Sequence, residues 1–253
     1  MSKNIFIGAV LALSLSACSQ HYALTSITRS RILIDSTYDR HPDAAAVNFV
    51  KPYKHVVDSI MNPVVGEVAE DMWAHQPESN LSNLLADIMV WAGKLYNEKP
   101  DMGLYNAGGI RATLPKGPVT YGDILDVAPF ENKICFVTLK GSDLTELFSQ
   151  IAMTGGQGVS HGVQINMTPD GKLLSASLNG KAIDPNALYR IATIDYVAQG
   201  NDKLTAMKRG TQVNAPQDES NNSRYIIVRY FKELASQGKA ASDKVEGRIT
   251  ITK

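Results

Sequence analysis

A short apolar run at residues 102–105 leads directly into residues 106–111, which read Asn-Ala-Gly-Gly-Ile-Arg. The run predicts a strand, and the small residues after it let the backbone come close to a ligand, because glycine has no Cβ. Arg111 adds a planar fork of donors that suits a carboxylate or a phosphate. A loop that binds a ligand at the end of a strand would explain both the small residues and the arginine. The alternative is a tight turn followed by an incidental surface arginine.

The other segments mix helices and strands. The clearest helix covers residues 79–95, where apolar residues recur every three or four positions. Asn80 is its expected N-cap, with Ser79 as the alternative. Further helices are expected at residues 120–125, 143–153 and 225–237, and strands at residues 31–34, 102–105, 133–140, 163–167, 173–178, 189–193 and 245–251. Because the elements do not alternate regularly as βαβ units, the pattern favours an α+β fold.

Turn and cap signals refine these boundaries. Asn179-Gly180 predicts a tight hairpin between two strands. Asn62-Pro63 is expected to end a helical start at residue 56. The Gly-rich residues 154–162 are expected to form a flexible loop, and Ser142 or Asp143 to cap the helix at residues 143–153.

The charge balance narrows the classes of partner. The 253 residues carry 25 Lys+Arg and 25 Asp+Glu, so the formal net charge is zero. This balance gives no electrostatic reason to expect a nucleic-acid partner. An anionic ligand would therefore have to be attracted by a local arrangement of side chains.

The N-terminus predicts secretion. Residues 1–18 combine Lys3 with an apolar stretch that is too short to span a bilayer, as in a secretory signal. Leu-Ser-Ala-Cys at residues 15–18 resembles a bacterial lipobox, which would leave a lipidated Cys18 at the mature N-terminus. The alternative is an ordinary signal peptide. We therefore expect a protein of the cell envelope, anchored by lipid on the periplasmic or surface side.

The remaining chain divides into a tether, residues 19–50, and one domain, residues 51–253. Cys135 is the only cysteine after Cys18, so the mature chain has no cysteine pair for an intramolecular disulfide. Since Cys135 lies in an apolar run, it is expected to be a small hydrophobic residue of the core.

Several motifs together resemble a known family. Besides residues 106–111, they are Pro-Phe-Glu-Asn at residues 129–132 and the segments 78–87, 139–144, 192–202 and 246–249. In this order they are similar to the C-terminal, substrate-binding domain of the 5′-nucleotidase family, over residues 55–253. The resemblance implies a four-layer α/β/β/α sandwich.

The resemblance also implies a substrate-binding site. Phe130 and Tyr196 would sandwich a planar base between their rings. Asp202 would accept hydrogen bonds from the base or the ribose, Asn106 would bind the ligand through its amide, and Arg111 would neutralise phosphate charge. Taken alone, Tyr196 could equally be a half-buried aromatic at a strand end, and Asp202 an Asx-turn residue. The full implied set is Asn106, Gly108, Gly109, Arg111, Phe130, Tyr196 and Asp202.

The chain departs from the family pattern where cations are expected. Family members commonly carry arginines just before or within the first helix, but this chain has uncharged or acidic residues at positions 76–79 and Asn83. Asn201 and Lys203 replace usual glycines. These changes favour recognition of a nucleoside or sugar nucleotide over strict recognition of a nucleoside monophosphate.

The chain is not expected to hold the family's metals. Hydrolysis in this family needs two metal ions that activate water, and they are bound by a separate N-terminal domain. Asp39-Arg40-His41 spells the first metal motif of that domain, but the later motifs do not follow, so we interpret it as chance. No residue is assigned a catalytic or metal-binding role and no cofactor is expected in this chain; divalent metals would belong to a partner.

The leading hypothesis is therefore the nucleotide- or nucleoside-binding half of a 5′-nucleotidase-type hydrolase of nucleotide catabolism. It would act with a separate metallophosphatase chain and be inactive alone. The alternatives are a periplasmic or surface nucleoside-binding protein and a non-catalytic scaffold. The preferred base and phosphate state stay open.

Overall fold

The computed structural model describes residues 24–252, so the expected signal segment and Cys18 lie outside the described residues. The chain divides into two compact units, residues 1–50 and 51–253. In the first unit, residues 24–50 are all exposed; they contain a short 3-10 helix, Tyr38–Arg40, and the start of a longer helix at Ala44. The strand expected at residues 31–34 is not formed. That prediction was wrong because β-branched residues favour a strand only where a neighbouring strand pairs with it.

Helix α2 (Ala44–Met61) ends just before Asn62-Pro63, where the sequence predicts a break. It begins at Ala44, within the stretch expected to be a tether, so the predicted start at residue 56 was too late. None of its side chains is buried. Among residues 24–252, no helix is both long and apolar enough to cross a membrane.

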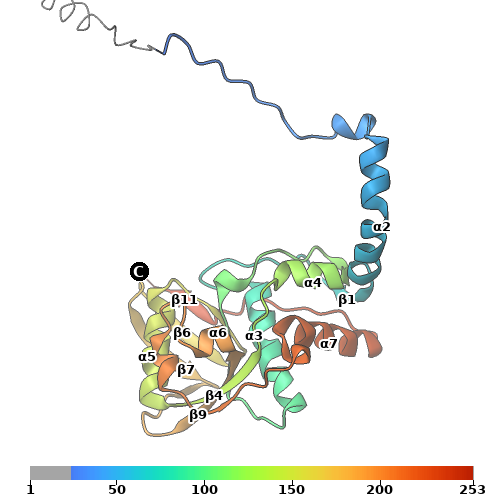
Figure 1. Cartoon of the computed structure of the whole chain (residues 1–253). Helices are drawn as coiled ribbons and strands as arrows, with labels where there is room; N and C mark the ends of the chain where they lie inside the picture. The colour runs from blue at the N-terminus through green and yellow to red at the C-terminus, as the bar shows by residue number, and fades with distance from the viewer. Residues whose placement is uncertain (1–23, 253) are drawn as a thin grey trace, which may run out of the picture. The chain divides into compact units, whose positions relative to one another are not determined.

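The domain contains three sheets (Figure 1). The largest has five strands in the order β10-β4-β9-β2-β5, the second has the order β11-β6-β7-β8, and β1 and β3 form an antiparallel pair. The strands are β1 (Val64–Val68), β2 (Met102–Tyr105), β3 (Gly117–Thr120), β4 (Ile134–Lys140), β5 (Gly158–Val159), β6 (Val163–Met167), β7 (Leu173–Leu178), β8 (Lys181–Ala182), β9 (Leu188–Ile194), β10 (Thr211–Asn214) and β11 (Ile249–Ile251).

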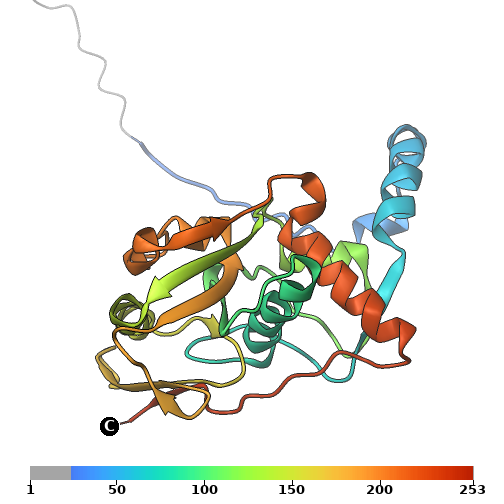
Figure 2. The same ribbon diagram turned by 90° about the horizontal axis from the view of Figure 1, so that it is seen from below.

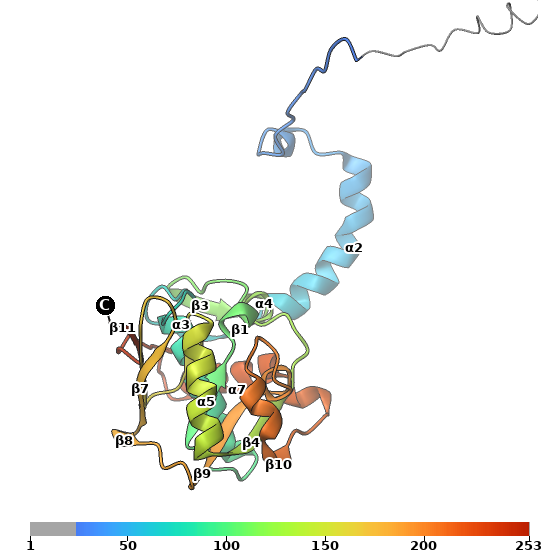
Figure 3. The ribbon, with the colours of Figure 1, turned by 90° about the vertical axis from the view of Figure 1, so that its left-hand side faces the viewer.

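Helices cover these sheets. Helix α3 packs on β2 and β5. Helix α7 packs on α3 and β1, and Figure 2 shows α3 and α7 side by side. Helix α5 contacts β4 as well as β6 and β7 of the second sheet (Figure 3). The expected mixed α/β sandwich is therefore confirmed. The helices of the domain are α3 (Asn80–Ala92), α4 (Tyr121–Val127), α5 (Gly141–Met153), α6 (Asp195–Ala198) and α7 (Ser223–Ser236), with 3-10 turns at Gly93–Leu95, Ala107–Gly109, Thr205–Arg209 and Glu219–Asn221.

Helix α3 forms as its apolar spacing predicts. Leu81, Leu84 and Leu85 are almost fully buried. Ser79, the alternative cap, is the N-cap residue: its hydroxyl accepts from the N–H of Ser82, which completes a capping box. Asn80 instead holds the preceding chain, since its side-chain oxygen accepts from a backbone N–H outside the helix.

The two strands that position the site lie side by side. β2 and β9 are parallel, with Met102 opposite Ile191 and Gly103 opposite Ala192. Gly103 allows β2 to lie close to α3, because a Cβ there would be only 2.1 Å from the carbonyl oxygen of Ala86. Cys135, on the neighbouring strand β4, is buried as expected, and burial raises the pKa of its thiol to about 11.

Local expectations fail where a long-range contact decides the structure. The Gly-rich residues 154–162 are not simply a flexible loop, because β5 within them pairs with β2. Helix α5 begins at Gly141 without a side-chain cap, and the expected last strand is limited to β11. The hairpin at Asn179-Gly180 is confirmed, with φ of +53° and +72° at its two central residues.

A buried arginine ties the C-terminal segment to the core. Arg248 is 3% exposed, and its guanidinium donates to the carbonyl oxygen of Val159 at 2.9 Å. The same group lies 2.9 Å from an oxygen of Asp87, 3.1 Å from Asp243 and 3.0 Å from Glu246. One cation therefore faces three carboxylates, and the most deeply buried of them, Asp243, has its pKa raised to about 7 by loss of water.

Candidate functional site

The candidate site lies where the parallel strands β2 and β9 end. Asn106 directly follows β2, and Tyr196 lies in the short helix α6 that follows β9. Carboxyl ends of neighbouring parallel strands meet at one edge of a sheet, where ligands of open α/β sheets commonly bind. Two motifs that are far apart in sequence are brought together in this way.

A pocket of about 200 Å³ occupies this edge. The pocket contains six of the seven residues in the implied site; Arg111 is the one that does not line it. The lining residues are Asn106, Gly108, Gly109, Phe130, Asn132, Tyr196 and Asp202.

Asp202 links the two sides of the pocket. One carboxylate oxygen accepts from the side-chain N–H of Asn106 at 2.8 Å, and the other accepts from the hydroxyl of Tyr196 at 2.9 Å. This carboxylate raises the pKa of Tyr196, because it stabilises the protonated hydroxyl. Each oxygen retains lone pairs for a further donor. Asp202 can therefore accept hydrogen bonds from ligand hydroxyls while it stays fixed.

Asn106 holds Asp202 and keeps further polar groups. It is 4% exposed, and one of the two N–H groups of its amide donates to Asp202. Its side-chain oxygen is buried without a hydrogen-bond partner among the described residues, so binding of a ligand through this amide stays a prediction. Gly109 is required beside it, since a Cβ at residue 109 would be 2.6 Å from the side-chain oxygen of Asn106. Gly108 differs: a Cβ there would meet no atom within 4 Å, so this part of the loop is open.

Both aromatic side chains remain accessible. Phe130 is 48% exposed and Tyr196 is 37% exposed, although both line the pocket. A large exposed phenylalanine ring beside polar groups is a suitable platform for a planar ligand. Tyr196 is fixed at both ends, because Asn201 donates to its backbone oxygen and Asp202 holds its hydroxyl.

Arg111 lies next to the pocket rather than in it. Its side chain is exposed, and its guanidinium reaches the backbone oxygen of Gly108 at a long 3.4 Å. Among the residues that the structure describes, it forms no ion pair. The guanidinium is thus available to an anion at the edge of the pocket.

The region that carries arginines in the family has a structural role here. The amide of Gln76 donates to the backbone oxygens of Thr154 and Gly156 and so holds the Gly-rich segment. Glu78 is 4% exposed and accepts from the amide of Asn83 at 2.7 Å. These positions supply no positive charge to the site.

Two residues of the site were not predicted from the sequence. Asn132 lines the pocket, and the side-chain oxygen of Gln157 accepts from the N–H of Ala107 at 2.8 Å and fixes the loop. Asn132 belongs to the quoted Pro-Phe-Glu-Asn motif, so the signal was present. Gln157 carries no such signal, because only the pairing of β5 with β2 brings it near the loop.

No metal site accompanies the pocket in the described part of the chain. Residues 24–252 contain no group of three or more His, Cys, Asp or Glu side chains that could hold a metal ion. Asp39 lies in the 3-10 helix Tyr38–Arg40 and His41 follows it, and both are exposed.

Comparisons with known proteins identify relatives. Endonuclease YhcR of Bacillus subtilis is 34% identical over 224 residues, which cover 83% of this chain and 18% of YhcR. The trifunctional nucleotide phosphoesterase protein YfkN of the same organism is 30% identical over 240 residues, covering 85% of this chain and 16% of YfkN. The chain thus spans less than a fifth of the length of these two curated relatives.

A solved structure shows the same fold. The 5′-nucleotidase precursor from Thermus thermophilus superposes with a TM-score of 0.70 at 27% identity, over 83% of this chain and 43% of that one. In addition, a model of the family described as "5'-nucleotidase, C-terminal domain" matches residues 64–209. Since this match covers more than half of the sequence and its residues build the pocket, the chain belongs to the family of 5′-nucleotidase C-terminal domains.

Proposed function

We propose that this chain binds the nucleoside part of a nucleotide in the pocket at the carboxyl ends of β2 and β9. The observation that carries the proposal is the placement of Phe130, Tyr196 and Asp202 around one small, open pocket. The aromatic rings suit the π-face of a base, and the carboxylate suits neighbouring hydroxyls of a ribose. The names of YfkN and the Thermus protein, a nucleotide phosphoesterase and a 5′-nucleotidase, agree with this substrate class.

The size of the pocket supports binding of a base rather than enclosure of a nucleotide. Its volume of about 200 Å³ lies below the ~300–1,000 Å³ of sites that enclose a drug-sized ligand. A base therefore enters the pocket while the phosphate stays at its edge. Arg111 lies two residues after Gly109 of the pocket, and its exposed guanidinium can meet that phosphate. Lys203, which directly follows Asp202, is a second exposed cation near the pocket.

We propose further that hydrolysis depends on a separate metallophosphatase chain. Two-metal hydrolysis requires a set of oxygen and nitrogen ligands around both ions, and the residues that the structure describes do not offer one. Divalent metals would then be bound by the partner. The function is one half of a nucleotide hydrolase; the alternative is a nucleoside-binding protein without a hydrolytic partner, because the pocket needs no residue from elsewhere.

The proposed location is the cell envelope. The lipobox-like Leu-Ser-Ala-Cys at residues 15–18 supports secretion and lipid attachment at Cys18. Mass spectrometry of the protein from its native membrane tests this assignment. A diacylglyceryl mass on Cys18 is expected, and its loss in a Cys18→Ala variant provides the control.

Calorimetric titration tests the binding proposal. Adenosine, AMP and UDP-glucose are titrated into the purified protein and into an Asp202→Ala variant. The wild-type protein is expected to bind at least one ligand, and the variant to bind it about tenfold more weakly, the effect of one charged hydrogen bond. Absence of binding by all three would refute the proposal. Turnover by the purified chain with added Mg²⁺ or Mn²⁺ would refute the need for a partner.

A further inference from the structure

Strand β1 has an open edge beside helix α7. β1 pairs with β3 along one side, with Gly66 opposite Val119, Glu67 opposite Pro118 and Val68 opposite Gly117. Its other side makes a single parallel bridge, from Val68 to Ala241. Because proline has no N–H, Glu67 and Pro118 cannot exchange hydrogen bonds, so Gly66 and Val68 bond to β3. The backbone of Glu67 therefore points away from β3.

The chain after α7 uses part of this edge. Ala241 donates its N–H to the backbone oxygen of Glu67 at 2.8 Å, and the N–H of Ala69 donates to Ala241 at 2.9 Å. Since the N–H and C=O of one strand residue point to the same side, the N–H of Glu67 also faces away from β3. Among the described residues, no hydrogen bond outside the pairing of β1 with β3 uses it. One donor of the strand edge thus stays unpaired where the neighbouring chain turns away.

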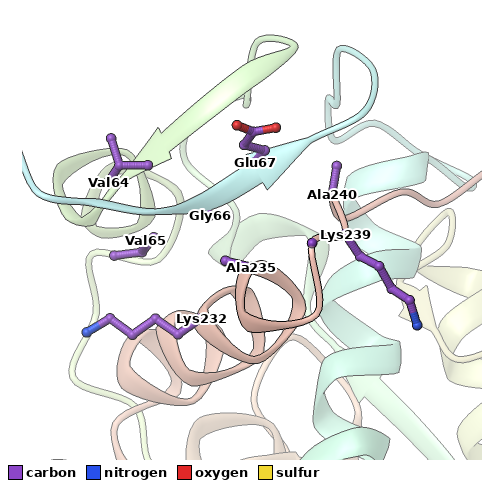
Figure 4. A pocket seen from close by; sticks show the side chains of 9 residues that line it. Val64, Val65, Gly66, Glu67, Lys232, Ala235, Lys239 and Ala240 are labelled. Atoms are coloured by element: carbon purple, nitrogen blue, oxygen red, sulfur yellow. The ribbon is translucent and has the colours of Figure 1, made fainter.

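A pocket of about 460 Å³ continues along this edge. Figure 4 shows it between β1 and α7, with Gly66 above the helix and Lys232 and Lys239 on either side of Ala235. Gly66 keeps the strand close to α7, since a Cβ there would lie 3.0 Å from the side chain of Phe231.

The surface around this edge is positively charged. Lys232 and Lys239 line the pocket, and Arg229, one turn before Lys232, lines an adjacent pocket that shares Lys232. All three side chains are exposed, and none forms an ion pair in the part of the chain that the structure describes. Among residues 24–252, Glu67 is the one acidic residue that lines the first pocket and Glu219 the one that lines the adjacent pocket, so three cations face two carboxylates.

We propose that the β1 edge binds an extended, acidic segment of a partner protein as an added strand. The unpaired N–H of Glu67 supplies the backbone contact, as in other strand-addition interfaces. The exposed cations of α7 select acidic side chains on that segment by charge complementarity. An exposed edge of this kind is otherwise a site of unwanted pairing.

A model peptide tests the proposal. A capped peptide of about six residues, the length of a typical strand, alternates valine with glutamate; its control carries lysine in place of glutamate. The glutamate peptide is expected to bind the purified protein and to slow hydrogen exchange at the amide of Glu67, with weaker binding at high salt. The lysine peptide is expected not to bind. Equal binding of both peptides, or of neither, would overturn the proposal.

Matched variants separate the backbone contact from the charge. Glu67→Pro removes the N–H and should weaken binding of the glutamate peptide about tenfold, the scale of one hydrogen bond. Glu67→Ala keeps the N–H and removes a like charge, so it should retain or strengthen binding of the glutamate peptide. Lys232→Glu combined with Lys239→Glu should abolish binding, whereas Lys181→Glu in the β7–β8 hairpin should not.

Two controls complete the design. Circular dichroism establishes that each variant is folded. Should Glu67→Pro not fold, the comparison of Lys232→Glu/Lys239→Glu with Lys181→Glu decides the outcome. Sedimentation of the protein alone detects a second copy on the same edge. A dimer that Glu67→Pro converts to monomer would assign the edge to self-association and overturn the acidic partner, as would unchanged peptide binding by the lysine variants.

Discussion

The buried charges around Arg248 should make the protein less stable as pH rises through neutrality. Asp243 has a side chain 8% exposed, whereas those of Asp87 and Glu246 are 31% and 39% exposed. With three carboxylates around one guanidinium, the most buried carboxylate is the one that takes up a proton. Its pKa is accordingly raised from 3.8 to about 7 by burial, against the opposing attraction of Arg248.

The sign and size of the effect follow from linkage. Between the unfolded pKa near 3.8 and the folded pKa of about 7, the native protein binds more protons than the unfolded chain. The stabilising contribution is therefore complete at low pH and is lost as pH rises through 7. Each pH unit within this window changes the free energy of unfolding by about 1.4 kcal/mol, and the loss from about pH 5 to pH 8 is about 2.5 kcal/mol.

Denaturant unfolding of the wild-type protein and an Asp243→Asn variant measures this effect. Asparagine imitates the protonated acid. The free energy of unfolding of the variant should therefore rise by about 2 kcal/mol relative to that of the wild-type protein between about pH 5 and pH 8. The difference between the two proteins removes the contributions that are common to both. Asp126→Asn, at an exposed carboxylate, is the control and should show no such change.

Two results would refute this reasoning. A free-energy difference independent of pH would mean that Asp243 does not titrate in the range. A free-energy difference that changes only below about pH 5, with the wild-type protein gaining stability as pH rises, would mean that Arg248 holds the pKa of Asp243 below its ordinary value of 3.8.

Three further substitutions have defined outcomes. Phe130→Ala should weaken nucleoside binding by about 1–3 kcal/mol through lost stacking. Because the ring is 48% exposed, the melting temperature should change little. A large loss of stability would argue against the stacking role. Arg111→Ala should weaken the binding of a nucleotide by about 1.5–3 kcal/mol more than the binding of its nucleoside, measured in paired calorimetric titrations. Equal losses of binding free energy for the two ligands would argue against a phosphate contact. Glu98→Ala should cost about 3–5 kcal/mol in denaturant unfolding. It leaves the guanidinium of Arg190 with hydrogen bonds to Thr138 and Gln212 but without a carboxylate, at a site where the side chains of Arg190 and Glu98 are both less than a fifth exposed. A loss below about 1 kcal/mol, the scale of an exposed pair, would show that water replaces the carboxylate.

The sequence predicts those elements whose signals are local. The apolar spacing of residues 79–95 predicts α3, and Asn179-Gly180 predicts the hairpin between β7 and β8. Strands β1, β5 and β10 were not predicted, because each is short and exists through pairing with a strand far away in sequence. The segment at residues 31–34 shows the reverse: strand-forming residues do not make a strand without a neighbour.

The sequence predicted which residues form the candidate site, but it did not predict the hydrogen bonds between them. The motifs indicated Phe130, Tyr196 and Asp202, and the parallel strands β2 and β9 bring their loops together. The hydrogen bond from Asn106 to Asp202 could not be derived from spacing, because it depends on how two distant loops meet. Gln157 likewise becomes part of the site only when β5 joins the sheet.

The hairpin at Asn179-Gly180 offers a practical point of attachment for a reporter. It lies in the chain between β2 and β9, yet the pairing of these two strands fixes the pocket whatever the length of the chain that connects them. The turn is open at Gly180, where a Cβ would meet no atom within 4 Å. A fluorescent domain inserted there lengthens only a surface connection, which loses little conformational entropy. Such a fusion could report ligand binding in living cells while the strands that hold the pocket keep their register.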